Sequence, residues 1–409
     1  MSRLALVVVL ALVPSAGLGC HSESRAAGSD AQSKAVGGGP QTEPVALLPG
    51  ATCSFPTRIH EDTSIAAGCV ADVTRNVLVE NGSTLTIEPG VTLRFADSSY
   101  LEIGHKGSRL VAKGTADKPI VFTSGAANKR PGDWIGLVFD DGIGEQGSTI
   151  EHAVIEYAGR DSHGGHGAIT VFTAFPAGRV NVRDVVFRHN NLAAVSDTFD
   201  GATFGAFERN RFENDAAALR VSAAVLAGIG AGNDFGSDAI EVLGGTIAHP
   251  GAFPALTGGI LVSRPILVAG AENAKLTLPR GLTLKFAKGT WLEIGVGAPG
   301  ALDAAGVTFT SAEKTRKPGD WIGVLFGDQS RSSRIAESVL EYAGGEDHGG
   351  DGAVTFVGKK SWQSLDVGIF GDTFRDNLQA HLSDNGEGCI KAIDPKNANG
   401  FAGNVEPCK

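Results

Sequence analysis

Short apolar runs separated by turn residues dominate the chain from about residue 75 onward. Each run has three to five residues, many of them β-branched, with Gly, Asn or Asp between consecutive runs. This pattern is typical of strands joined by tight turns. The clearest runs are Val77–Val79, Leu85–Ile87, Val91–Phe95, Leu101–Ile103, Ile120–Phe122, Ile135–Phe139, Val154–Tyr157 and Ala168–Phe172. No helix-period pattern separates runs this close together, which excludes βαβ crossovers and leaves a sandwich, a barrel or a β-helix.

A longer period favours the β-helix among these folds. Phe187, Phe212 and Phe235 are spaced by 25 and 23 residues, each is soon followed by Asn or Asp (Asn190, Asn214 and Asp238), and Phe374 begins a similar segment. A unit of this length with recurring Phe and Asn positions is typical of one coil of a parallel β-helix. We therefore predict that inward Phe side chains stack from coil to coil and that Asn side chains form hydrogen-bonded ladders along the turns.

Several long stretches of the chain occur twice. TLTIEPGVTLRFADSSYLEIG at 84–104 matches residues 275–295 at 11 of 21 positions. KRPGDWIGLVF at 129–139 returns at 316–326, and EYAGRDSHGGHGAITV at 156–171 returns at 341–356. The offset between equivalent residues shrinks from 191 to 185 along the chain. Short deletions between intact blocks are what a repeat architecture tolerates in its loops, so the sequence predicts two diverged copies of one segment.

The motifs TLTIEPGVTLRF, PIVFTS, GDWIGLVF and EHAVIEYAG resemble those of bacterial envelope proteins with right-handed parallel β-helix repeats. The resemblance covers about residues 75–215 and again about 264–382. It implies an all-β chain that forms a right-handed parallel β-helix, a solenoid containing an internal duplication. The wider fold also includes polysaccharide lyases, glycoside hydrolases and adhesins, so the resemblance predicts a fold rather than a function.

The N-terminal residues predict export and a lipid anchor. Residues 1–19 carry one early charge, Arg3, before an apolar run at 4–13, which is shorter than the ~20 residues that cross a bilayer. Gly17–Cys20 resembles the cleavage box of bacterial lipoproteins, although Gly17 and Leu18 depart from its usual residues. The resemblance implies a signal peptide at 1–19, lipidation of Cys20, and a membrane partner reached through the lipid. Because His21 rather than Asp follows the Cys, it also implies an outer-membrane or cell-surface location.

The cysteines and the composition divide the rest of the chain. Residues 20–49 are rich in small and polar residues and predict a flexible tether. Residues 50–409 then form the β-helix body, with a C-terminal cap at 383–409. Five cysteines are an odd number, which assigns a special role to one. Once Cys20 is lipidated, three pairings of the other four are open, and the short-range pairs are the economical choice because each would clip one end of the body. These pairs are Cys53–Cys69 and Cys389–Cys408.

Twin His-Gly-Gly loops carry the strongest candidate chemistry. Each loop combines carboxylate and imidazole groups, which can contact a ligand or coordinate a divalent metal. The candidate residues are Asp161, His163 and His166 in one loop and Asp347, His348 and Asp351 in the other. Two alternatives stay open: an ordinary turn in which the glycines supply positive φ, and a catalytic site. No metal or cofactor is assigned, because a metal centre needs three or four ligands that the loops do not plainly supply.

Other candidates keep an enzymatic alternative open. Asp184, Asp215 and Asp238 come from neighbouring coils, where carboxylates could align as in a lyase or hydrolase. Trp134 and Trp321 each follow an Asp and could stack on a sugar, although each also begins a strongly apolar strand and is expected to pack inward. A net charge of −10 argues against nucleic acid as a partner.

The function predicted from the sequence is that of a lipid-anchored, non-catalytic cell-envelope protein. Its role is structural or adhesive, with polysaccharide or another envelope component as the partner. The alternative is a polysaccharide lyase or glycoside hydrolase on a β-helix scaffold. Whether the chain is an enzyme is left open, because no sequence signature of a catalytic site other than the candidate residues above is present.

Overall fold

The computed structural model describes residues 52–104, 106–140, 144–164, 166–172, 179–197, 204–345, 348, 352–358, 365–378 and 380–384. All of them belong to one structural unit, residues 44–409. Strands account for nearly all of their regular structure, and the one helix among them is α1 (Ala223–Ala227). The predicted signal peptide, the predicted tether and most of the predicted C-terminal cap lie outside the described residues, so those boundaries stay predictions.

Five sheets form the coils, and the strands of each sheet pair in parallel. Sheet 1 contains β1 (Thr52–Ser54), β4 (Val70–Val73), β7 (Thr92–Phe95), β10 (Ile120–Ser124), β13 (Ala153–Glu156), β16 (Val186–Arg188) and β19 (Arg211–Glu213). Sheet 3 contains β3 (Thr63–Ile65), β6 (Thr84–Ile87), β9 (Arg109–Lys113), β12 (Ser148–Glu151), β15 (Val180–Arg183) and β18 (Phe204–Glu208).

Sheet 2 is the longest, with 13 strands that run through both copies of the duplicated segment. Its strands are β2 (Arg58–Ile59), β5 (Val77–Val79), β8 (Tyr100–Ile103), β11 (Gly136–Phe139), β14 (Ile169–Val171), β17 (Val195–Asp197), β20 (Leu219–Val221), β21 (Ile240–Val242), β24 (Ile260–Val262), β27 (Thr283–Phe286), β30 (Thr308–Ser311), β33 (Val339–Glu341) and β36 (Thr373–Arg375).

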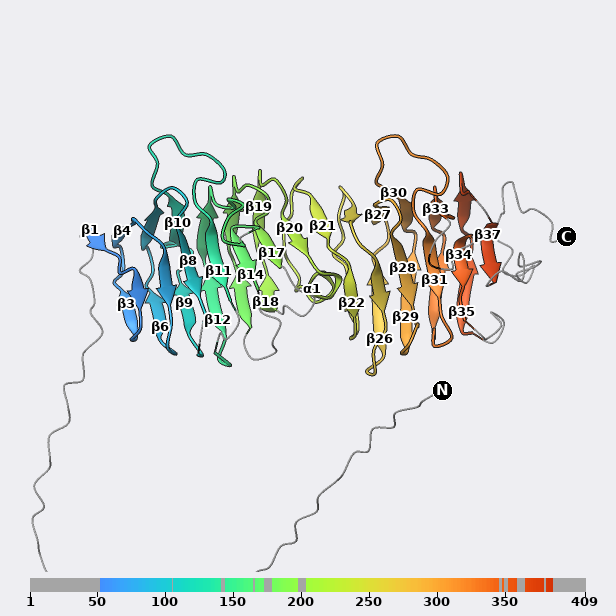
Figure 1. Cartoon of the computed structure of the whole chain (residues 1–409), viewed down its shortest axis with the longest axis horizontal. Helices are drawn as coiled ribbons and strands as arrows, with labels where there is room; N and C mark the ends of the chain where they lie inside the picture. Colours follow the sequence, from blue (N-terminus) through green and yellow to red (C-terminus); the bar gives the residue numbers. More distant parts are fainter. Residues whose placement is uncertain are drawn as a thin grey trace, which may run out of the picture. The chain divides into compact units, whose positions relative to one another are not determined.

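The remaining two sheets belong to the second half. Sheet 4 contains β22 (Gly245–Ile247), β25 (Ile266–Val268), β28 (Trp291–Ile294), β31 (Gly323–Phe326), β34 (Gly352–Phe356) and β37 (Ala380–Asp384). Sheet 5 contains β23 (Gly251–Ala252), β26 (Ala274–Leu278), β29 (Gly300–Ala305), β32 (Ser333–Ala336) and β35 (Val367–Phe370). Strands pair with those about one coil further along the chain, which makes the fold a parallel β-helix (Figure 1), and it fits the right-handed type that was predicted.

The interior is filled by alternate residues of the short strands. Strands such as β6 and β7 alternate intermediate and buried positions, because successive side chains point to opposite faces of a strand. The predicted Phe stack is confirmed: the ring centroids of Phe187 and Phe212 are 5.0 Å apart, and those of Phe212 and Phe235 are 5.1 Å apart. Stacking like residues on successive coils buries a continuous core along the solenoid.

Trp134 and Trp321 point into this core. Both are fully buried, and they stack on Phe95 and Phe286 with ring centroids 4.0 and 4.2 Å apart. The prediction of inward packing is therefore confirmed, and neither indole is available to a sugar. Each indole N–H also donates a 2.9 Å hydrogen bond to a backbone carbonyl of the next coil, which satisfies the one polar atom of the ring.

The duplicated copies place equivalent strands in different sheets. Strands β7 and β10 belong to sheet 1, whereas their counterparts β27 and β30 continue sheet 2. Strand β8 belongs to sheet 2, whereas its counterpart β28 belongs to sheet 4. The change occurs where α1 follows β20 and contacts β22 and β23, the first strands of sheets 4 and 5. Sheet 2 crosses this junction without a break, so the two copies form one continuous stack of coils.

Candidate functional site

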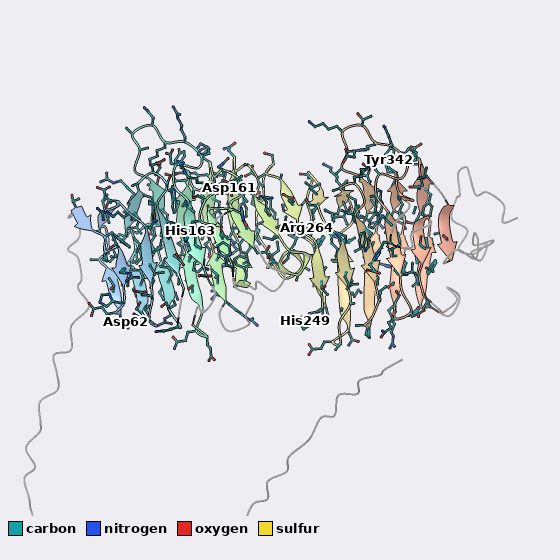
Figure 2. All side chains as sticks on the ribbon, in the orientation of Figure 1. Asp62, Asp161, His163, His249, Arg264 and Tyr342 are labelled. Carbon is teal, nitrogen blue, oxygen red and sulfur yellow. The ribbon has the colours of Figure 1, made fainter. Side chains whose placement is uncertain are left out.

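A histidine of the first His-Gly-Gly loop lies against the outer face of sheet 2. The ring of His163 stacks on Tyr100 with centroids 4.2 Å apart and planes inclined by 10°. Its Nε2 atom lies 3.2 Å from Oε2 of Glu102, two residues further along β8. The three side chains therefore form one contact group, drawn from strand β8 and a loop about 60 residues later in the chain. Figure 2 labels His163.

The second copy builds the same group from different residues. His348 stacks on Trp291 with centroids 4.1 Å apart, and its Nε2 atom lies 3.5 Å from Oε2 of Glu293. The histidine side chains are 44% and 43% exposed and the glutamates 13% and 13%, so each group presents an imidazole above a half-hidden carboxylate. We call His163, Tyr100 and Glu102, and their counterparts, the His–ring–Glu units.

Strand register explains how the units form. Tyr100 and Glu102 are two residues apart on β8, so both side chains point outward. The neighbouring strand β11 is buried at all four of its positions, and so is its counterpart β31. Alternation alone would leave two residues of each strand exposed, so the outer face of these strands is covered as well. The sequence analysis predicted ordinary strands here and did not predict that their outer faces are buried.

Backbone geometry at the two histidines differs from the turn hypothesis. The sequence analysis assigned positive φ to the glycines, and Gly164 does have φ of 69°. His163 and His348 themselves have φ of 51° and 55°, in the left-handed region that is uncommon for residues other than Gly, although Asn, Asp and His are enriched there. The loop therefore holds each imidazole in a defined place at a cost in backbone strain.

The other candidate residues are only partly brought together. His166 Nδ1 lies 3.3 Å from Asp161 Oδ1 in a second, more exposed pair. Within the described parts of the chain, no group of three or more His, Cys, Asp or Glu side chains is arranged to hold a metal ion. Asp347 and Asp351 lie outside the described residues. A divalent metal at either loop therefore stays a prediction.

A second duplicated cluster was missed by the sequence analysis. Glu156 is 5% exposed, and its Oε1 accepts a 2.6 Å hydrogen bond from Thr123 while its Oε2 accepts one of 2.6 Å from Arg188. Lys129 lies 3.5 Å from the same carboxylate and 5.5 Å from the ring centre of Tyr157. Burial by itself would raise the pKa of Glu156, but the hydrogen bonds from Thr123 and Arg188 outweigh it and the pKa is lowered.

The second copy repeats this cluster with an arginine in place of the lysine. Glu341 accepts hydrogen bonds from Thr310 and Arg375, and Arg316 lies 3.6 Å from it and 5.8 Å from the centre of the Tyr342 ring. The sequence analysis assigned no role to Lys129 or Arg316. The repeated Glu-Tyr of the EYAG motif was the signal that could have found this cluster.

The three acids proposed for an enzyme do not share one outer face. Asp184 pairs with Arg209, whose hydrogen bonds lower the pKa of that carboxyl. Asp215 and Asp238 do align from coil to coil, since the backbone N–H of Asp215 donates to Asp238 over 2.9 Å. That alignment is part of a turn ladder inside the molecule, where Asp215 is only 7% exposed.

A groove of about 460 Å³ lies on the outer face of sheet 3. Gly205 leaves room for the Asn181 side chain, because a Cβ there would lie 2.2 Å from Oδ1 of Asn181. Arg183 is fixed by 3.0 Å contacts to two glutamates, one on each neighbouring strand. The lining residues are Glu145, Gln146, Gly147, Arg179, Asn181, Arg183, Gly205 and Ala206. Amide, guanidinium and carboxylate groups of this kind can hydrogen-bond a hydroxylated ligand.

Of the four cysteines predicted to form disulfides, the structure describes the side chain of Cys69 alone. Cys69 is buried and disulfide-bonded. The backbone of Cys53 on β1 pairs with Ala71, two residues after Cys69. The identity of the partner stays a prediction, because the Cys53 side chain lies outside those that the structure describes, as do Cys20, Cys389 and Cys408. None of the helices within the described ranges is long and apolar enough to span a membrane.

Comparison with known proteins agrees with the fold. A family model described as a pectate-lyase like beta helix domain matches residues 57–173. The match contains the first His–ring–Glu unit and the Glu156 carboxylate, and it ends before the second copy begins. Neither the curated proteins nor the solved structures contain a significant match to this chain. The chain is therefore similar over this region to the pectate-lyase-like β-helix class.

Proposed function

We propose that this chain is an exported, lipid-anchored protein of the bacterial cell envelope that binds glycan through its β-helix without cleaving it. The anchor and the location rest on the N-terminal sequence and its resemblance to lipoproteins. The binding role rests on the side chains that the β-helix presents outward. A divalent metal at the loops belongs to the same proposal.

The observation that supports binding is the recurrence of the His–ring–Glu unit. The ring is Tyr100 in one copy and Trp291 in the other, yet each copy has an imidazole stacked on an aromatic ring within 3.5 Å of a carboxylate. An imidazole and a carboxylate supply hydrogen-bond donors and acceptors, and the ring beside them supplies apolar surface. This combination suits a ligand that carries both hydroxyl groups and apolar C–H faces, as sugars do.

Binding should be tested on the purified chain with a glycan array, followed by calorimetric titration of the best ligand. The variant to compare is His163→Asn combined with His348→Asn, because Asn tolerates the left-handed backbone of these positions while removing both ring stacks. We expect the variant to lose at least about tenfold in affinity, which corresponds to about 1.4 kcal/mol.

His249→Asn provides a matched control. His249 lies 3.3 Å from Glu272, so it is another His–Glu pair, but its side chain is 73% exposed and it lies on a different part of the solenoid from His163 (Figure 2). Within the described structure, no aromatic stack involves His249. This control should bind as the unchanged chain does. Equal affinity of the double variant and the unchanged chain would remove the units from the binding surface.

The second candidate function is cleavage of a polysaccharide. The observation that favours it is the cluster of Lys129, Tyr157 and Arg188 around the buried Glu156, of which all but Arg188 lie within the region similar to a pectate-lyase-like domain. Positioned Lys and Tyr side chains can act as general acids or bases. Incubation with a panel of polysaccharides, followed by assays for new reducing ends and for unsaturated products, tests this candidate. Cleavage that Lys129→Met abolishes would support it, and the absence of any product would eliminate it.

A further inference from the structure

Asparagine side chains in the turns share one hydrogen-bonding geometry. The side-chain oxygen accepts a backbone N–H of the preceding coil, and the side-chain NH₂ donates to the carbonyl three residues before that N–H. The examples are Asn190 with Ala158 N (2.9 Å) and Ile155 O (3.0 Å), Asn210 with Val185 N (3.1 Å) and Val182 O (3.0 Å), and Asn377 with Ala343 N (2.8 Å) and Leu340 O (3.1 Å). One side chain thus satisfies both a donor and an acceptor of the backbone.

Aspartates occupy two positions of the same kind. Asp215 Oδ1 accepts the backbone N–H of Asn190 over 2.7 Å, and Asp372 Oδ1 accepts that of Ser338 over 2.7 Å. The residues are 7% and 2% exposed. The second oxygen of each carboxyl, Oδ2, is buried and has no hydrogen-bond partner within the described structure. These are the atoms that stand where the NH₂ group stands in an Asn.

The three-residue spacing between the bonded N–H and carbonyl of each Asn contact identifies the group that each Oδ2 atom should contact. Counting back from Asn190 leads to the carbonyl of Phe187, and counting back from Ser338 leads to the carbonyl of Ile335. Oxygen facing oxygen is unfavourable unless a proton lies between them. An ionised carboxylate only accepts hydrogen bonds, whereas a protonated carboxyl has one O–H to donate, as the Asn amide has N–H.

We propose that Asp215 and Asp372 are proton-binding sites of the folded β-helix, each holding a proton on Oδ2 and donating it to the carbonyl oxygen of Phe187 or Ile335. The nearest charged groups add to this preference, since Asp238 faces Asp215 and Glu337 faces Asp372, and both are carboxylates. Asp238 itself accepts the backbone N–H of Asp215. No cation faces either carboxyl among the interactions that shift its titration in the described structure.

Burial, the largest cause, raises the pKa of Asp215 and of Asp372 to about 7. An aspartate in the unfolded chain titrates near its ordinary value of about 3.9. The stabilising contribution is therefore fully present below that ordinary value and is lost as the pH rises toward 7. Over this interval, each group lowers the equilibrium constant between folded and unfolded chain by up to about tenfold per pH unit. The coils should consequently be more stable at pH 5 than at pH 8.

The ladder of Asp215 also reaches the first His–ring–Glu unit. Asp215 binds Asn190, and Asn190 accepts the N–H of Ala158, from which the chain continues into the loop that carries His163. The carboxyl of Asp215 thus supports, through its Oδ1 atom and Asn190, the turn from which that loop starts.

Chemical unfolding of the full chain at pH 5 and pH 8 tests the proposal, with Asp215→Asn combined with Asp372→Asn as the variant. We expect the unchanged chain to lose stability from pH 5 to pH 8. We expect the variant to lose less and to be at least as stable as the unchanged chain at pH 8, since Asn supplies the missing donor permanently. Equal pH dependence of the two proteins, or a variant that is less stable at pH 8, would overturn the proposal.

Asp184→Asn is the control, because hydrogen bonds from Arg209 lower the pKa of Asp184. It should leave the difference between pH 5 and pH 8 unchanged. An infrared difference spectrum between pH 5 and pH 8 gives a second measurement that does not depend on unfolding. The protonated-carboxyl band of the folded chain should weaken at pH 8, and the double variant should lack that change. A variant spectrum identical to that of the unchanged chain would place the protons elsewhere.

Discussion

Replacing Trp134 by Ala should remove one of the largest contributions to the stability of the core. The indole is fully buried, stacks on Phe95 at 4.0 Å, and donates to the carbonyl of Glu156. A buried aromatic side chain removes about 150–250 Å² from water, which at about 25 cal/mol per Å² corresponds to about 4–6 kcal/mol. Alanine retains part of that area, so we expect a loss of about 3–5 kcal/mol, in the range of large-to-small core substitutions.

Trp134→Phe separates the two contributions of the indole. Phenylalanine keeps a ring that can stack on Phe95 but cannot donate a hydrogen bond, so the carbonyl of Glu156 loses that donor. A buried group left without its partner costs about 1–3 kcal/mol. Trp321→Ala and Trp321→Phe should show the same order of effects, because that indole stacks on Phe286 and donates to the carbonyl of Glu341 over 2.9 Å.

Urea unfolding followed by far-ultraviolet circular dichroism measures these losses as shifts of the midpoint at constant slope. Trp291→Ala is the control, since this indole lies on the outer face of β28, stacks on His348 and is not fully buried. It should cost clearly less than either core substitution. A loss below about 1 kcal/mol for both Trp134→Ala and Trp321→Ala, or an equal loss for Trp291→Ala, would refute the reasoning from burial.

Three further experiments address other parts of the chain. Cys20→Ser should release the protein from the membrane fraction, and a variant that still sediments with membranes would contradict the anchor. Peptide mapping without reduction should link Cys53 to Cys69, and a link from Cys69 to another cysteine would contradict the local clip. Gly323→Ala should destabilise the fold, since φ is 140° and a Cβ would lie 2.6 and 2.8 Å from two backbone carbonyl oxygens, whereas Gly258→Ala meets open space. Equal midpoints of urea unfolding for these two glycine variants would contradict the close approach.

The stacking of the core could be predicted from the sequence because it depends on one recurring residue type. Phe187, Phe212 and Phe235 recur at nearly one coil length, so their period along the chain becomes their spacing in space. The ladder was predicted less accurately. Asn214 was expected to belong to it, but the neighbouring Asp215 makes the contact. The residue that makes the ladder contact can shift by one position within a turn without a visible change in the sequence pattern. Only the backbone geometry decides which of the neighbouring residues points inward.

The His–ring–Glu units could not be predicted because their parts are far apart in the sequence. His163 meets a glutamate 61 residues earlier, and that distance depends on the lengths of two coils with loops of different size. A usable signal was nevertheless present. Both copies keep an aromatic residue and a Glu at alternate positions of an outward strand face, as YLEI and WLEI. An aromatic residue retained on the polar face of a strand needs a partner on that face, which pointed to the loop above it.

The unbroken course of sheet 2 through both copies fixes the distance between the two His–ring–Glu units. Seven strand steps separate β8 from β27, the strand that leads into β28. At about 4.8 Å per step, the units lie about 34 Å apart along the stack. The hydrogen bonding of that sheet is continuous, so we expect the spacing between the two units to be constant. If the units bind glycan as we propose, a chain shorter than that span would occupy one unit at a time, whereas a longer chain would engage both and gain avidity without any new contact.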